Sequence, residues 1–337
     1  MNRRYRAVMM SGVLVLSYCS TALSDNAEPL MSRAKALFQP LPDTAATTAR
    51  PTPANRVNLG RALFFDTRLS IDGTVSCRTC HIPELYGTDG LPKSVGVDHR
   101  QNARNAPSIL NAAIGIKAHW DGGREDVEDQ ATKAFIGPKS FGNPDFPAVM
   151  KRLEALGYQP SFDAAFPEHT PTMTPETLGL AIGSYERTLL TPAPFDRYLH
   201  GDDTALSPPA KEGLKLFIER GCGQCHAGPL VGGRQFQKFG LFKEYWTLTG
   251  SLEHDEGRFL LTHQESDRYV FKVPGLRNVA MTPPYFHDGS VEDLRSAIRI
   301  MGQVQLGQTL TDPELNAIEA FLNSLTGSQP TNFSPIH

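Results

Sequence analysis

Two copies of one short motif constrain this chain more than any other feature. Each copy has the pattern Cys-x-x-Cys-His, and the copies occupy residues 77–81 and 222–226. In proteins that attach haem c, the two thiols of this pattern bond to the vinyl groups of the macrocycle, and the adjacent imidazole binds the iron. The motif residues are Cys77, Cys80, His81, Cys222, Cys225 and His226. The sequence therefore predicts two covalently attached haem c groups, each with its own histidine on the iron.

Disulfides and zinc are the alternatives for these cysteines. Exported proteins often pair their cysteines, but a disulfide across two intervening residues closes a small and strained ring. Thiolates and imidazoles also bind zinc. We favour haem because a histidine follows each pair directly, and because two complete motifs are not expected by chance in a chain with 5 cysteines.

The start of the chain predicts export to the periplasm. Three arginines stand among the first six residues, an apolar run follows over residues 7–18, and Ala22 and Ser24 supply a small-x-small cleavage site. The apolar run is too short to span a bilayer stably. Cleavage near Ser24 removes the fifth cysteine, Cys19. Lipid attachment at Cys19 is the weaker alternative, because Tyr18 stands where a small residue is usual.

The charge pattern argues against nucleic acid as a partner. The formal net charge is -3, from 33 lysines and arginines against 36 aspartates and glutamates. The basic residues are dispersed along the chain, so that neither a basic groove nor a polybasic membrane patch is predicted.

A weak internal repeat predicts two equivalent halves. The pattern Gly-x-x-Leu-Phe precedes each haem motif, at residues 60–64 and 213–217. A segment with apolar residues at helical spacing, residues 181–189, follows the first motif, and a matching segment, residues 317–325, follows the second. Each half thus has the order helix, haem motif, loops and closing helix.

This order predicts an all-α fold of two cytochrome c-like haem domains with long loops and little strand. A macrocycle replaces much of the apolar core of such a domain, and the 26 prolines and 29 glycines suit loops that wrap around it. The proline-rich segment 191–194 is the expected boundary between the domains, and we expect a loose tail. The predicted divisions are signal peptide 1–24, leader or linker 25–54, N-terminal domain 55–194, C-terminal domain 195–328 and tail 329–337.

The ordered motifs between about residue 55 and residue 327 resemble those of the bacterial di-haem cytochrome c peroxidase and MauG family. Besides the two haem motifs, they are Arg104-Asn105-Ala106-Pro107-Ser108, Trp120-Asp121-Gly122, Val273-Pro274-x-Leu276-Arg277-Asn278 and Pro284-Tyr285-Phe286-His287-Asp288-Gly289. The resemblance implies that the haem of His81 meets hydrogen peroxide and that the haem of His226 is a low-spin electron relay.

The resemblance also assigns two residues to electron transfer. Met301 lies fourteen residues beyond His287, where peroxidases of the family place the axial methionine and MauG places tyrosine. A thioether opposite histidine raises the potential of the iron. The alternative is a core methionine on a helix predicted over residues 291–301. Trp120 resembles the bridging tryptophan between the two haems, and its alternative is likewise a packing role.

A structural calcium ion is a further implication of the family. Asn105, Thr282 and Pro284 resemble the residues that hold it between the domains. Amide, hydroxyl and carbonyl oxygens suit this hard cation.

The peroxide side is where the chain departs from the family. Gln130 falls at the position of the family's catalytic glutamine, but Ser140 replaces the glutamate that moves a proton between the peroxide oxygens. Water, Lys139 or a distant acid then substitutes, or turnover is slow. Val97 replaces the histidine that caps the peroxidatic iron at rest, and His99, two positions on, is either a cap after a loop shift or an exposed loop residue.

These features leave three hypotheses for function. The first is a periplasmic enzyme that reduces hydrogen peroxide with electrons from a small c-type cytochrome or cupredoxin. The second is a MauG-like enzyme that uses peroxide to oxidise tryptophan or tyrosine side chains of a partner protein; Met301 favours the first hypothesis, whereas Val97 and Ser140 favour the second. The third is an electron-transfer cytochrome, which needs strong ligands on both sides of each iron. A homodimer is compatible with all three.

Overall fold

The computed structural model describes residues 28–335 of the chain. The predicted signal peptide and Cys19 lie outside the described residues. The α-helices are α1 (Leu30–Leu37), α2 (Ala54–Phe65), α3 (Cys77–Cys80), α4 (Val127–Ala134), α5 (Phe146–Ala155), α6 (Gln159–Ala165), α7 (Pro175–Glu186), α8 (Pro194–Leu199), α9 (Pro208–Glu219), α10 (Trp246–Thr249), α11 (Phe259–Thr262), α12 (Leu294–Leu306) and α13 (Asp312–Asn323).

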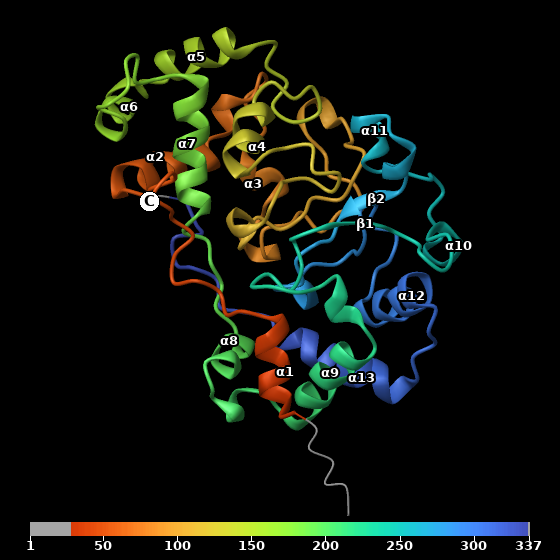
Figure 1. The fold of residues 1–337 in the computed structure, drawn as a ribbon. Helices are drawn as coiled ribbons and strands as arrows, with labels where there is room; N and C mark the ends of the chain where they lie inside the picture. Colours follow the sequence, from red (N-terminus) through yellow and green to blue (C-terminus); the bar gives the residue numbers. More distant parts are fainter. Residues whose placement is uncertain (1–27, 336–337) are drawn as a thin grey trace, which may run out of the picture.

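Helices and long loops dominate the structure (Figure 1). The described residues contain one sheet, in which β1 (Phe236–Lys238) runs antiparallel to β2 (Val270–Lys272) with Gln237 opposite Phe271. The prediction of a helical fold with little strand is therefore confirmed. No helix within residues 28–335 is long and apolar enough to cross a membrane.

The two segments of the internal repeat form the same helix crossing in both halves. In the first half α2 packs against α7, and in the second α9 packs against α13. A Cβ atom at Gly60 would collide with the carbonyl of Ala181, and one at Gly213 would collide with the carbonyl of Ala317. The repeated glycine is thus required because the two backbones touch where the helices cross.

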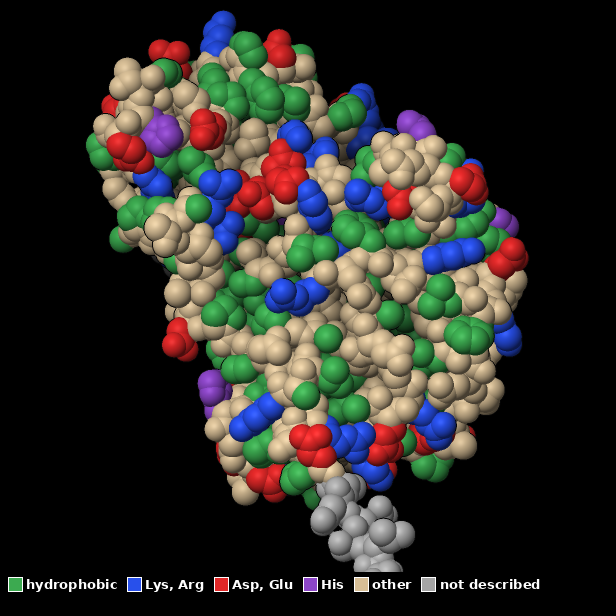
Figure 2. All heavy atoms as spheres, viewed as in Figure 1, with side chains coloured by type: hydrophobic (Ala, Val, Ile, Leu, Met, Phe, Trp, Pro, Cys, Tyr) green, Lys and Arg blue, Asp and Glu red, His purple; other side chains and the backbone are tan. Residues whose placement is uncertain are grey.

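Two large apolar clusters and a small third one form the core. The first gathers residues between Leu59 and Leu189, and the second gathers residues between Phe195 and Leu325. Acidic and basic side chains are interspersed over the face of the molecule that Figure 2 shows.

Both ends of the described chain cross to the opposite half. Helix α1 packs beside α8 and α9, and its Ala34 and the following Phe38 belong to the second core cluster (Figure 1). The leader is therefore more than a linker, because its apolar side chains repeat at helical spacing and bury against α9.

The prediction of a loose tail was wrong. Phe333 is 4% exposed and packs in the first core cluster, against Phe64. The Arg61 guanidinium donates to the backbone carbonyl of Ser334 (2.7 Å), and the Tyr185 hydroxyl donates to that of Asn332 (3.0 Å). The Phe333 side chain and these hydrogen bonds hold the C-terminal tail on the N-terminal half.

Candidate functional site

The first haem motif forms one helical turn. Ser76 caps α3 in a capping box with Thr79, and the turn brings Cys77 and Cys80 to the same side of the helix. Both thiols are free. Burial raises the pKa of the Cys80 thiol to about 11, which favours the protonated thiol at neutral pH.

His81 follows directly and is positioned by its own loop. Its backbone nitrogen donates to the Cys77 carbonyl (3.0 Å), and its Nδ1 lies 3.0 Å from the Gly87 carbonyl oxygen. With Nδ1 as the donor, Nε2 is the ring nitrogen left for the iron. Burial lowers the pKa of His81, which favours the neutral, ligating form.

The second motif has the same backbone pattern on a shorter turn. Cys222 begins a 3-10 turn after Gly221, which has a positive φ of 92°, and the His226 nitrogen donates to the Cys222 carbonyl (3.0 Å). Cys222 and Cys225 are free thiols. The buried Nδ1 of His226 has no hydrogen-bond partner in the structure, and burial lowers the pKa of this imidazole to about 4.

Both motifs therefore fit haem c. All four described cysteines are free, as covalent attachment to haem requires. Within residues 28–335 no group of three or more His, Cys, Asp or Glu residues is arranged to hold a metal ion, so the zinc alternative finds no ligand set. The iron-binding roles of His81 and His226 remain predictions.

Met301 lies on α12, and the boundaries predicted for this helix were wrong. The helix begins at Leu294, where the Asp293 side chain accepts from the Ser296 nitrogen, and continues beyond Met301 to Leu306. Proline-free sequence after Met301 explains the extension, and a left-handed Gly307 (φ 63°) ends it. Met301 is half-buried. Its role as a haem ligand remains a prediction.

Trp120 lies where the two halves meet. Its indole Nε1 donates to the Asn105 carbonyl (3.0 Å), and its own carbonyl accepts from the nitrogen of Lys272 on β2 (2.7 Å). Its ring makes an edge-to-face contact with His287, with centroids 6.4 Å apart. The residue thus contacts both halves, as a bridging role requires.

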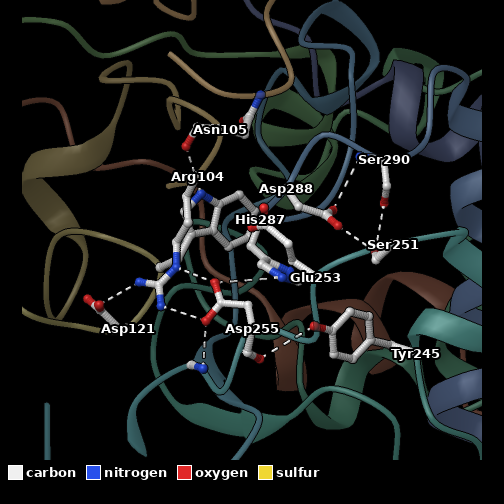
Figure 3. A network of polar contacts seen from close by, with 12 residues as sticks. Arg104, Asn105, Asp121, Tyr245, Ser251, Glu253, Asp255, His287, Asp288 and Ser290 are labelled. Carbon is white, nitrogen blue, oxygen red and sulfur yellow. Dashed lines mark hydrogen bonds and ion pairs between the residues drawn. The ribbon is translucent and has the colours of Figure 1, made fainter. Parts of the chain in front are cut away.

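Charged side chains beside Trp120 connect the halves, and sequence reasoning gave them no role. Arg104 donates two hydrogen bonds to Asp255 (2.6 and 2.9 Å) and pairs with Asp121 on its other side (Figure 3). His287, only 2% exposed, has its Nε2 3.8 Å from Asp255. Arg104, Asp121 and His287 stood in matched motifs, whereas no motif includes Asp255.

These charges shift one another's ionisation. Burial raises the pKa of the Asp255 carboxyl, but hydrogen bonds from the Arg104 guanidinium outweigh burial and hold that pKa below its usual range. Burial lowers the pKa of His287, which favours its neutral form. The junction therefore combines an ionised carboxylate–guanidinium pair with a neutral imidazole.

The three predicted calcium residues lie in two neighbouring segments. Asn105 is buried, and its amide donates to the Leu91 carbonyl (2.8 Å), while its backbone nitrogen donates to the His287 carbonyl (2.8 Å). Pro284 is buried three residues before His287, and the Thr282 hydroxyl donates to the Val279 carbonyl (3.3 Å). The segments meet, and calcium binding remains a prediction.

The predicted peroxide residues lie on two segments of the first half. Gln130 is half-buried on α4, and Ser140 is half-buried in the loop that follows. The Ser140 carbonyl accepts from the nitrogen of Val97 (3.0 Å), whose side chain is 1% exposed and packs in the core. His99 is exposed, with a φ of 55°. In this conformation Val97 holds the core position and His99 faces solvent.

Comparison with known proteins gives consistent similarities. The family model described as di-haem cytochrome c peroxidase matches residues 54–204. The cytochrome c551 peroxidase of Pseudomonas aeruginosa is 40% identical over 327 residues, which cover 95% of this chain and 92% of the relative. The methylamine utilization protein MauG of Methylorubrum extorquens is 34% identical over 297 residues, 86% of this chain and 82% of the relative.

A solved structure has a similar fold. The crystal structure of a MauG-like protein associated with microbial copper homeostasis superposes with a TM-score of 0.74 at 27% identity, covering 87% of this chain and 96% of that one. The similarity therefore extends over most of both chains.

Proposed function

The chain belongs to the di-haem cytochrome c peroxidase family, and from that premise we propose that it is a periplasmic enzyme that reduces hydrogen peroxide with electrons from a small donor protein. Its activity is that of a di-haem peroxidase, and its cofactors are haem c groups. The observation that carries the proposal is the pair of free-thiol haem motifs, one in each half, with Trp120 at the junction. The predicted signal peptide supports the periplasmic location, and a c-type cytochrome or cupredoxin is the proposed donor.

In the first half, the chain's own residues orient the peroxide site. The haem groups, when bound, supply the redox chemistry that cleaves the peroxide bond. The Gly87 carbonyl holds the His81 ring in one tautomer and one orientation. Gln130 supplies an amide that hydrogen-bonds a peroxide oxygen. Val97 presents an aliphatic side chain that does not bind iron, so access to the site requires no prior reduction.

Proton transfer is the weak step of this site. A serine hydroxyl does not act as a base near neutral pH, so Ser140 provides no substitute for a carboxylate. General acid–base help is worth about 100-fold to 10,000-fold in rate. We therefore expect peroxide access at rest with slow cleavage of the O–O bond.

In the second half, we propose that His226 and Met301 would both hold the haem iron. A thioether ligand beside an imidazole would give that iron a high potential, which suits acceptance of electrons from the donor. Trp120, at the junction, would couple the two haem groups when they are bound. A calcium ion held by Asn105, Thr282 and Pro284 would stiffen the same junction.

A MauG-like activity is the second candidate. Val97 and Ser140, together with the 34% identity to a MauG protein, favour an open iron that oxidises tryptophan or tyrosine of a partner protein. An electron-transfer cytochrome is disfavoured because the chain offers one convincing sixth ligand, Met301, for two irons. A homodimer is compatible with either activity.

Stopped-flow spectra of the holoprotein mixed with hydrogen peroxide test the proposal. We expect the fully oxidised protein to react without prior half-reduction, and we expect Ser140→Glu to accelerate the reaction while Gln130→Ala slows it. Steady-state consumption of peroxide with a reduced c-type cytochrome separates the peroxidase from the MauG-like enzyme. Two low-spin haems at rest, with a reaction only after half-reduction, would mean that His99 or another residue caps the iron.

A further inference from the structure

Both tryptophans of the chain lie in one continuous series of contacting rings. The sequence contains 2 tryptophans, Trp120 and Trp246. From Trp120 the series runs to His287 (ring centroids 6.4 Å apart), then to Tyr245 (5.2 Å) and then to Trp246 (5.0 Å). The two central rings are buried, with Tyr245 at 0% and His287 at 2% exposure. The series therefore leads from the junction of the halves through protein interior.

The far end of the series reaches solvent. Trp246 is the first residue of α10 and is half-buried. Its ring stacks on the exposed His254 at 4.2 Å and 16°, and it contacts Tyr269 at 5.0 Å. Electron tunnelling through protein weakens steeply with the gap between donor and acceptor, and consecutive ring contacts keep each gap short.

The surroundings of each ring decide which residue of the series would be left oxidised. Oxidation of tyrosine requires loss of the phenol proton, but the Tyr245 hydroxyl donates to the Asp255 backbone carbonyl (3.4 Å), which does not take up a proton. The Lys238 ammonium lies 6.0 Å from the Tyr269 ring centroid and opposes positive charge there. Trp246 is half-buried and stacks on the exposed His254, so that its ring borders solvent, and it is therefore the favoured end point.

We propose that Trp246 is a reserve electron donor, connected to the peroxide site through Tyr245, His287 and Trp120. The inference rests on the proposed function, because peroxide supplies the oxidant. Reduction of one peroxide to two waters takes up two electrons and two protons. Trp246 would give one electron and release its indole proton to solvent, the haem groups, when bound, would supply the other electron, and solvent would supply the two protons. Two electrons from the donor protein, with one proton from solvent, would then restore the haem groups and Trp246; without a donor the tryptophan radical adds dioxygen irreversibly.

Peptide mapping of the holoprotein tests this route. The protein is treated with hydrogen peroxide in air-saturated buffer without a donor, and oxygenated Trp246 is measured per peroxide consumed. We expect Trp246 to be the main oxygenated aromatic residue, and its yield to fall severalfold in Tyr245→Phe and in Trp120→Phe. Tyr198→Phe, which alters a buried tyrosine outside the series, is the matched control and should retain the wild-type yield.

A second readout is independent of the mass measurement. Freeze-quenched samples should show a tryptophan radical by electron paramagnetic resonance in the wild type and none at this position in Trp246→Phe. Equal oxygenation of Trp246 in all variants would mean direct attack from solvent and would overturn the route. Peroxide consumption with Trp246 left intact would overturn the route alone, whereas absence of peroxide consumption would overturn the proposed function as well.

Discussion

The two halves share a frame and differ in what they place around the iron. Each half contains an asparagine in left-handed conformation, Asn111 or Asn278. Its backbone N–H donates to the carbonyl of the last leucine in the closing helix segment, Leu189 or Leu325. Its side-chain oxygen accepts from the backbone nitrogen two residues after that leucine. The frame of the two halves is therefore duplicated in detail.

The differences concern the loops and the iron ligands. His81 has a carbonyl partner for Nδ1, whereas Nδ1 of His226 is buried without a hydrogen bond in the structure. A hydrogen bond to Nδ1 raises the basicity of the ligating nitrogen. Val97 packs in the core of the first half, where the resemblance places the capping residue of the peroxidatic iron, and Met301 is the proposed ligand of the second. On the proposed function, one frame would thus carry an open site and a closed one.

Removal of either cysteine pair breaks this comparison most severely. Cys77→Ala/Cys80→Ala and Cys222→Ala/Cys225→Ala should each retain one covalent haem, whereas the wild type should carry two and no free thiol. Loss of the first pair should abolish the peroxide reaction. Intact mass and pyridine haemochrome spectra measure the haem content, and a wild-type mass without two haem additions would contradict the assignment.

Substitution of the glycine at a helix crossing should give the next largest effect, a loss of stability. Gly213→Ala forces a Cβ atom against the Ala317 carbonyl, which should lower the free energy of unfolding by about 3 kcal/mol or more. Glu212→Ala changes the exposed neighbour on α9 and should have little effect. Denaturant unfolding followed at the haem absorbance measures both variants, and equal midpoints would show that the helices separate readily.

Removing the proposed ligand at Met301 and introducing a ligand at Val97 tests the two proposed sites. Met301→Leu keeps the volume and removes the sulfur, so the low-spin signal of the His226 haem should be lost and its potential should fall. Val97→His should instead close the first site and make peroxide reactivity depend on half-reduction. Magnetic circular dichroism and redox titration measure both changes; an unaltered ferrous spectrum in Met301→Leu would make Met301 a packing residue.

Local sequence patterns predicted the frame because most of its determinants are local. The cysteine pairs and the apolar spacing of the closing helices each act within a few turns of chain. Gly60 and Gly213 act through contacts far away in sequence, at the carbonyls of Ala181 and Ala317, and only the repetition of their motif revealed them. The tail was mispredicted because Phe333 is a single aromatic residue whose partner, Phe64, lies far away in sequence. Asp255 was missed for the same reason, since nothing near it in the sequence indicates a pairing with Arg104.

Acid sensitivity of the junction gives the smallest expected effect. Because Arg104 holds the pKa of Asp255 below its usual range, this pair stabilises the protein above about pH 4, the ordinary pKa of aspartate, and the stabilisation is lost as the pH falls through the lower folded-state pKa. Asp255→Asn should therefore lower the free energy of unfolding by about 2 kcal/mol at neutral pH, less than for a fully broken buried pair because Asp121 still faces Arg104. The deficit should shrink at acidic pH, where the wild-type carboxyl is also neutral.

Glu253→Gln, at an exposed pair with Lys93, is the matched control and should change stability little. A deficit that persists unchanged in acid would mean that Asp255 acts through packing, and the two halves would then be held together by shape and not by charge.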